Sequence, residues 1–124
     1  MDCSNEYIKM CEGAFEDLGI PQIYYGTIMF PILWATKDLM GQYVLLRQGL
    51  EPMSGKRWPL YCQDHLQGIM NFKNAFFWIR AFDNWFEKHP YYISQTMEQL
   101  SLMFVMEKKY EKLWIGTEWI KKGG

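Results

Sequence analysis

The segment from Thr96 to Ile120 has the most regular hydrophobic pattern in the chain. Thr96 followed three residues later by Gln99 has the form of a capping box, which predicts that a helix begins at this threonine. Apolar side chains then recur at three- and four-residue spacings and also fill the faces between: Met97, Leu100, Leu102, Met103, Phe104, Val105, Met106, Tyr110 and Leu113. Because the middle of this helix is apolar on nearly all sides, we expect it to be buried in a core or in a subunit contact.

The pattern changes after Lys112. The sequence becomes Leu-Trp-Ile-Gly-Thr-Glu-Trp-Ile, in which a Gly-Thr pair separates two apolar pieces that each contain a tryptophan. This arrangement is typical of a short β-hairpin, so the helix is expected to lead into a β element.

Three earlier segments also have helical spacing. Residues 5–18 form one such segment, which ends at Gly19, and residues 63–70 form a second. The third covers residues 72–89 and is ended by Pro90. We expect its inward face to consist of Phe72, Ala75, Trp78, Ile79, Phe82, Trp85 and Phe86.

Strand formers dominate the region between the first two helices. Residues 22–48 are rich in β-branched and aromatic side chains, and Pro31 disfavours a continuous helix, so we predict two or three strands there. Residues 58–61 predict another strand, at a sheet edge because Pro59 lacks an N–H group. The element order predicts an α+β fold in a single domain over residues 1–124. A small antiparallel β-sheet in the N-terminal half packs with three to four α-helices, and a short β-hairpin follows at the C-terminus.

Composition narrows the classes of partner. The chain of 124 residues is 49% hydrophobic and 18% aromatic, which indicates a dense core or an adhesive surface. Its 13 basic and 14 acidic side chains give a net charge of −1. The sequence also lacks a long run of basic residues that could contact successive phosphates, so we expect no nucleic acid polymer as partner. No apolar run reaches membrane length and the N-terminus lacks a leader pattern. We therefore expect a cytoplasmic protein without a membrane contact.

Few side chains are suited to catalysis. Cys3, Cys11 and Cys62 are odd in number and lack C-x-x-C spacing, which disfavours a disulfide framework and a zinc site. Cys62 and His65 are close enough in sequence for a nucleophile pair, but no third orienting group is evident, and buried, idle cysteines are the simpler interpretation. Phosphate-binding glycine loops and paired carboxylates are also missing. We expect no enzyme activity, no catalytic residue, no metal and no cofactor.

The last half of the chain resembles a group of short proteins from phages and prophages of clostridia and bacilli. The resemblance rests on QDHLQ at 63–67, MEQLSLMFVM at 97–106 and W-x-G-x-x-W at 114–119. The sequence departs from the group's pattern at His65 and Ser101. The resemblance implies a phage origin.

Size and helix-rich α+β character are also similar to the first family of Thoeris anti-defence proteins, which sequester cyclic ADP-ribose isomers in dimer-based assemblies. This similarity implies a protein of the host-cell cytoplasm that binds a small nucleotide-derived immune signal without cleaving it. It further implies a homodimer or higher homo-oligomer, and a pocket with an aromatic stack and a few arginines.

Candidate ligand-binding residues follow from side-chain chemistry. Phe77 falls in the same arc of the helix over 72–89 as Arg80 and Lys88, and a ring among cations suits a nucleotide base and its phosphates. The full set that we expect to contact the ligand is Arg57, Phe77, Arg80, Phe82, Met106 and Lys108. In this set the arginines hold phosphates, a phenylalanine stacks on the base and Met106 packs beside it. Packing of Phe77 against another element or subunit stays open as the simpler alternative.

Two other classes of function stay open. The first is an inhibitor of a host defence or transcription complex, which binds its protein partner through an exposed aromatic and methionine-rich surface. Trp58, Trp78, Trp85 and Trp114 are the tryptophans expected to supply that surface. The second is a structural protein of the virion. Self-association that buries Leu100–Met106 is compatible with all three classes.

Overall fold

A computed structural model of the chain describes residues 2–20, 24–25, 28–29, 33–46, 56–70, 75–89 and 94–123. Its helices are α1 (Asn5–Leu18), α2 (Gln63–Met70), α3 (Ala75–Glu87) and α4 (Met97–Tyr110). Its strands are β1 (Tyr24–Tyr25), β2 (Ile28–Met29), β3 (Leu33–Lys37), β4 (Tyr43–Leu46), β5 (Arg57–Leu60), β6 (Lys112–Trp114) and β7 (Trp119–Lys121). The predicted α+β fold with a small antiparallel sheet and a C-terminal hairpin is confirmed.

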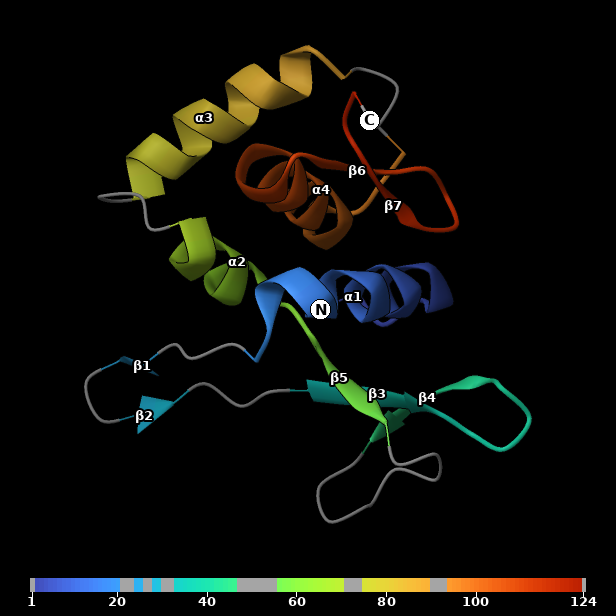
Figure 1. Ribbon diagram of the computed structural model, residues 1–124. Helices are drawn as coiled ribbons and strands as arrows, with labels where there is room; N and C mark the ends of the chain where they lie inside the picture. Colours follow the sequence, from blue (N-terminus) through green and yellow to red (C-terminus); the bar gives the residue numbers. More distant parts are fainter. Residues whose placement is uncertain are drawn as a thin grey trace.

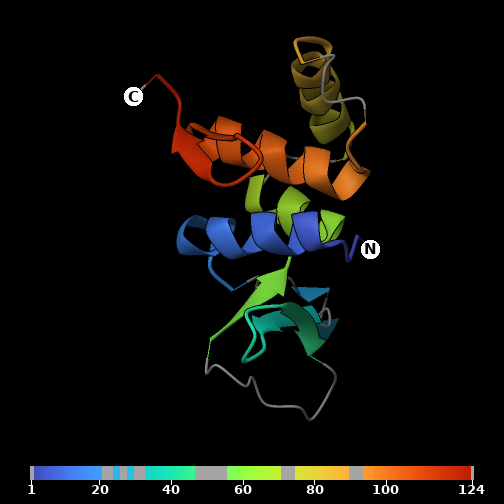
Figure 2. The same ribbon diagram turned by 90° about the vertical axis from the view of Figure 1, so that its right-hand side faces the viewer.

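The elements are stacked in layers along the vertical direction of Figures 1 and 2. α3 lies at one end, α4 and α1 follow, and the three-stranded sheet lies at the other end. α1 therefore contacts β5 on one side and α4 on the other, while α2 packs against α4. None of the helices in the described ranges combines the length and the apolar character needed to cross a membrane.

α4 is the central helix of the core. The Thr96 hydroxyl accepts a hydrogen bond from the backbone N–H of Gln99 at 3.2 Å, and Glu111, at a left-handed φ of 55°, ends the helix. The consecutive residues 99–107 are all buried. The predicted start and burial are confirmed, and the chain's own core covers Leu100–Met106. This part of α4 consequently presents no accessible surface for self-association.

α1 is fixed at both ends by local signals and along its length by the sheet. The Ser4 hydroxyl accepts a hydrogen bond from the Tyr7 N–H at 3.2 Å, and Gly19 ends the helix at a positive φ of 68° that favours glycine. The indole N–H of Trp58, on β5, donates to the backbone oxygen of Ile8 at 3.0 Å. This bond joins the three-stranded sheet to the first half of α1.

The sheet has the antiparallel order β4-β3-β5. Pro59 pairs with Trp34 on the edge strand β5, as predicted from its missing N–H group. β1 and β2 form a separate two-stranded pair. The described parts of residues 22–48 thus hold four strands instead of the two or three predicted, because two of the strands are only two residues long and give almost no periodic signal.

α3 packs on α4 through an aromatic stripe. Trp78 and Trp85 are 6% and 3% exposed, and Phe104 of α4 lies edge-on to Trp78 with ring centroids 5.1 Å apart. Ile79, which we expected on the inward face, is 59% exposed. That expectation was wrong because α3 contacts α4 through positions 78, 82 and 85. Ile79 follows Trp78 directly, so its side chain is rotated by about 100° around the helix axis from that of Trp78.

The four tryptophans expected on an exposed surface are instead buried. Trp58, Trp78, Trp85 and Trp114 have exposed fractions of 1%, 6%, 3% and 8%. Each of them packs in the core cluster, where a large ring contributes most to stability. The aromatic-rich composition therefore reflects mainly a dense core.

One buried carboxylate joins three elements around the end of α4. Glu107 is 8% exposed and accepts hydrogen bonds from the Trp85 indole and, at 3.1 Å, from the Lys122 ammonium group. The His89 Nε2 atom lies 3.4 Å from the same carboxylate. Burial raises the pKa of Glu107, but the hydrogen bonds from Trp85 and Lys122 and the nearby positive charges outweigh it, so the pKa is below its ordinary value.

A carboxylate with a lowered pKa stabilises the fold above its unfolded-state pKa, near 4.5, and loses this contribution as the pH falls through the folded-state pKa. Glu107→Gln is therefore expected to lower the free energy of unfolding at pH 7 by about 1.5–3 kcal/mol. The difference from the parent protein should shrink as the pH falls below about 4.5. Urea unfolding at a series of pH values measures this, with the exposed Glu111→Gln as a control that shows no such loss.

Candidate functional site

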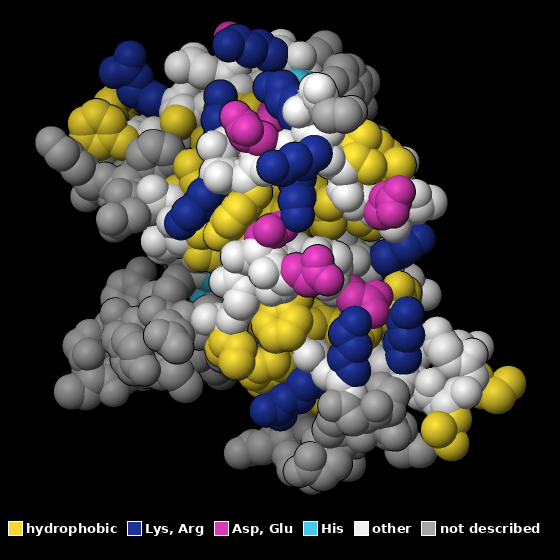
Figure 3. Space-filling view, viewed as in Figure 1, with side chains coloured by type: hydrophobic (Ala, Val, Ile, Leu, Met, Phe, Trp, Pro, Cys, Tyr) yellow, Lys and Arg dark blue, Asp and Glu magenta, His cyan; other side chains and the backbone are white. Residues whose placement is uncertain are grey.

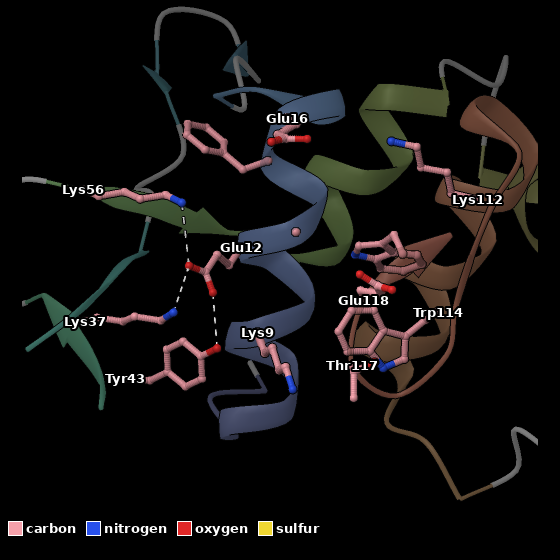
Figure 4. A pocket seen from close by; sticks show the side chains of 13 residues that line it. Lys9, Glu12, Glu16, Lys37, Tyr43, Lys56, Lys112, Trp114, Thr117 and Glu118 are labelled. Carbon is pink, nitrogen blue, oxygen red and sulfur yellow. Dashed lines mark hydrogen bonds and ion pairs between the residues drawn. The ribbon is translucent and has the colours of Figure 1, made fainter. Parts of the chain in front are cut away.

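A cavity of about 560 Å³ lies over the exposed side of α1, between the three-stranded sheet and the C-terminal hairpin (Figure 4). Its floor on α1 consists of Lys9, Glu12, Gly13, Phe15 and Glu16. The sheet side contributes Lys37, Tyr43 and Lys56, and the hairpin side contributes Lys112, Trp114, Thr117, Glu118 and Trp119. The cavity therefore combines segments from the beginning, middle and end of the chain.

The amphipathic pattern of α1 creates this floor. Tyr7, Met10 and Ala14 turn into the core and are fully buried, so the polar residues at positions 9, 12 and 16 fall on the side that faces away from it. Gly13 lies among them and is exposed. Because glycine has no side chain, the Trp119 ring can lie against the helix at this point.

Three side chains converge on Glu12 at the sheet side of the cavity (Figure 4). The ammonium groups of Lys37 and Lys56 lie 3.5 Å and 3.8 Å from one carboxylate oxygen, and the Tyr43 hydroxyl donates to the other oxygen at 3.2 Å. Burial, followed by the charge of Glu12, raises the pKa of Tyr43, which keeps the phenol a hydrogen-bond donor. An anionic group that enters here meets two cations and a hydroxyl donor that now share the Glu12 carboxylate.

The hairpin side of the cavity is aromatic. The Trp114 indole N–H donates to the Glu6 carboxylate and the Trp119 indole N–H donates to the backbone oxygen of Met10, each at 2.9 Å. The two rings are 5.2 Å apart between centroids. Both polar edges point to α1. Trp114 is buried, so the partly exposed Trp119 supplies most of the indole carbon surface that lines the cavity.

The charges around the cavity are only partly paired. Lys112 forms an ion pair with Asp17 at 2.7 Å. Lys9, Glu16 and Glu118 form no ion pair with any residue that the structure describes. The lining holds four lysines and three glutamates, but Asp17 neutralises the charge of Lys112, so the positive and negative charges of the site nearly balance.

A second cavity, of about 390 Å³, lies between α2, α3 and the start of α4. Its lining is Gln63, Gln67, Trp78, Ile79, Arg80, Phe82, Asp83 and Met97. Apolar and aromatic side chains dominate this lining, and Arg80 is its one cation.

The structure distributes the six predicted ligand-binding residues over the molecule. Arg80 and Phe82 line the second cavity, and Phe77, 45% exposed, lies on the same helix. Arg57 lies on β5, where its guanidinium carbon is 4.3 Å from the Trp34 ring centroid. β5 and α3 are on opposite sides of the α1 and α4 layers (Figure 1).

The two predicted residues on α4 also lie apart from each other. Met106 is fully buried and lines neither of the two cavities, whereas Lys108 is exposed. A single ligand is thus not positioned to contact the whole predicted set.

The Cys62 and His65 pair has a structural role. The His65 Nδ1 atom accepts a hydrogen bond from the backbone N–H of Cys62 at 3.2 Å, as the third residue of a helix does in a capping box. Cys11 is buried, and burial raises the pKa of its thiol to about 12, so Cys11 remains a thiol. Within the described ranges, no group of three or more His, Cys, Asp or Glu side chains is placed to hold a metal ion.

No family model matches the chain, and the searches of curated proteins and of solved structures found no significant match.

Gly13 allows the hairpin to approach α1. A Cβ atom at this position would lie 2.8 Å from Cδ1 and 3.3 Å from Nε1 of Trp119. Gly13→Ala is thus expected to destabilise the protein by about 1–3 kcal/mol, although alanine is the better helix former. In a double-mutant cycle, this cost should disappear in a Trp119→Ala background. An equal cost in both backgrounds would show that the indole is not the cause.

Proposed function

We propose that this protein binds a small anionic ligand with an aromatic group, of the nucleotide type, in the cavity over α1 and holds it uncleaved. The observation that carries this proposal is that Lys37 and Lys56 converge on the Glu12 carboxylate at one side of the cavity. The indoles of Trp114 and Trp119 line the other side. Ammonium groups bind phosphate oxygens, and indole surface packs on a base. The two parts of a nucleotide thus each have a suitable partner.

The dimensions of the cavity support this class of ligand. Small-molecule sites enclose roughly 300–1,000 Å³, and the cavity over α1, at about 560 Å³, falls within this range. The second cavity is smaller and has one cation, so it suits a polyanion less well.

The resemblance of the C-terminal half to phage proteins favours an immune signal of the host as the ligand. A protein that only sequesters such a signal needs affinity and no reactive group. The cyclic ADP-ribose isomers fit the chemistry of the site, because they contain adenine and a diphosphate. We therefore infer an anti-defence role in the host cytoplasm.

Inhibition of a host protein is the second candidate. The tryptophans expected to form its surface are buried, but α3 exposes Phe76, Phe77 and Ile79 to 61%, 45% and 59%. Large exposed apolar groups on one helix are typical of an interaction surface. This surface is separate from the cavity over α1, so the two candidates are tested separately.

A ligand that binds only the folded state must raise the midpoint of thermal unfolding. At a concentration 100 times its dissociation constant the gain is about 2.7 kcal/mol, which corresponds to a rise of about 10 °C for a domain of this size. We expect such a rise with one compound from a panel of cyclic ADP-ribose isomers, ADP-ribose and cyclic dinucleotides. The compound should be recovered intact after the complex is denatured. A rise that sodium sulfate reproduces at equal ionic strength, or no rise at all, would contradict the proposal.

Single substitutions distinguish the cavity over α1 from other sites. Lys37→Ala and Lys56→Ala should each weaken binding about tenfold, because each removes one cation from the anionic group of the ligand. Glu12→Gln should strengthen binding about threefold or more, because it removes a competing negative charge. Isothermal titration measures these changes, with Arg80→Ala and Lys108→Ala as matched controls outside the cavity that bind as the parent does. Loss of binding in Arg80→Ala alone would move the site to the second cavity.

A further inference from the structure

One face of α3 is exposed along the helix, and its residues Ile79, Arg80 and Asp83 also border the second cavity. Phe76, Arg80, Asp83 and Glu87 follow one another at spacings of four, three and four residues, so they form one stripe, and each of them is exposed. Ile79 flanks the stripe and is 59% exposed. We call these five residues the α3 outer face.

This face is held on a rigid support. On the opposite side of the helix, Phe82 stacks between Trp78 and Phe86, with ring centroids 6.1 Å and 6.3 Å away. Trp85 donates its indole hydrogen bond to Glu107 of α4. The outer face is therefore presented without the entropic cost that ordering a loop requires.

Large apolar side chains are concentrated on this exposed helix. Phe76 is 61% exposed, and Met97, at the rim of the second cavity beside α3, is 52% exposed. Figure 3 shows hydrophobic side chains next to Lys or Arg side chains at the upper left, where α3 begins in Figure 1. Such a surface is more apolar than a solvated helix face needs to be.

The charges of the face differ between its two halves. Arg80 is in the N-terminal half, with its guanidinium carbon 5.9 Å from the Phe76 ring centroid, while Asp83 and Glu87 are in the C-terminal half. Neither acid forms an ion pair with any residue in the described ranges. Arg80 and Asp83 are thus arranged so that they complement each other when one copy is reversed.

We propose that the α3 outer face binds the same face of a second copy of this chain, with the two α3 helices antiparallel. A two-fold axis midway between positions 80 and 83 sets Arg80 against Asp83 of the partner subunit, and by symmetry Asp83 against Arg80 of the partner subunit. The same axis lies within one residue of the middle of α3, which spans Ala75–Glu87, so the helices overlap over their full length.

Antiparallel packing is favoured over the parallel alternative for two reasons. In a parallel pair related by a two-fold axis, each Arg80 meets another Arg80 and each Asp83 another Asp83, which is repulsive. Antiparallel helices also place opposite ends of their dipoles side by side. The interface covers Phe76 and Ile79, which are otherwise the most exposed apolar groups of the helix.

This inference does not depend on the proposed ligand. It also differs from self-association through α4, whose residues 99–107 are already buried within one chain. A pair of helices about 20 Å long is a small interface, so we expect a reversible dimer whose formation depends on concentration.

Charge reversal tests the pairing on the full chain. In sedimentation velocity runs over a series of concentrations, the parent protein should dimerise, and Arg80→Asp and Asp83→Arg should each weaken the dimer at least tenfold. A mixture of the two variants should restore it, because Asp at 80 then faces Arg at 83, and Asp83 faces Arg80, across the interface. Lys108→Glu, a charge reversal at an exposed position on α4, should dimerise as the parent does.

The mixed sample makes the result independent of any general effect of the substitutions. Native mass spectrometry should detect the heterodimer of the two variants and little of either homodimer. Circular dichroism should show that both variants are folded. A parent protein that stays monomeric at all concentrations would overturn the inference and assign the face to an unlike protein partner. A dimer that neither variant weakens, or a mixture that fails to restore the dimer, would also overturn it.

Discussion

The burial of α4 on every side is the constraint on which the rest of the structure depends. Residues 99–107 have no solvent-facing side, so other elements must surround the helix, and α1, α2, α3 and β6 all contact it. The polar groups at its ends are satisfied within the fold. Thr96 caps the first turn, and the Glu107 carboxylate is bound by Trp85 and Lys122. A chain of 124 residues thereby obtains one continuous core around a single helix.

This arrangement also determines where a ligand site can form. α1 lies between α4 and the sheet, and the hairpin after α4 returns to α1 through the indole bonds of Trp114 and Trp119. The sheet and the hairpin thus rise on two sides of the polar face of α1. Lysines from one side and aromatic surface from the other face the same space, which is a suitable combination for a small anion with a ring.

Local signals in the sequence predicted the elements well, but not their contacts. The start of α4 at Thr96, the end of α1 at Gly19 and the bounds of α2 all follow from caps and periodicity. Ile79 was assigned to the wrong face because a helix that is apolar over a wide arc does not define its own orientation. The cavity over α1 was missed because it depends on distant pairs, such as Trp119 and Met10, which are 109 positions apart. Arg57 and Arg80, which were predicted as ligand-binding residues instead, have suitable chemistry but lie in different layers of the fold, on β5 and on α3.

The central claim is that a nucleotide-type ligand binds between the sheet and the hairpin, and the indole N–H signals in a two-dimensional NMR spectrum test it most directly. The six tryptophans are spread over the sheet, α3 and the hairpin, so each signal reports on one region once single Trp→Phe variants have assigned it. On titration with a cyclic ADP-ribose isomer, the signals of Trp114 and Trp119 should move while those of Trp78 and Trp85 stay in place. Movement confined to Trp78 and Trp85, or no movement with any nucleotide, would contradict the account.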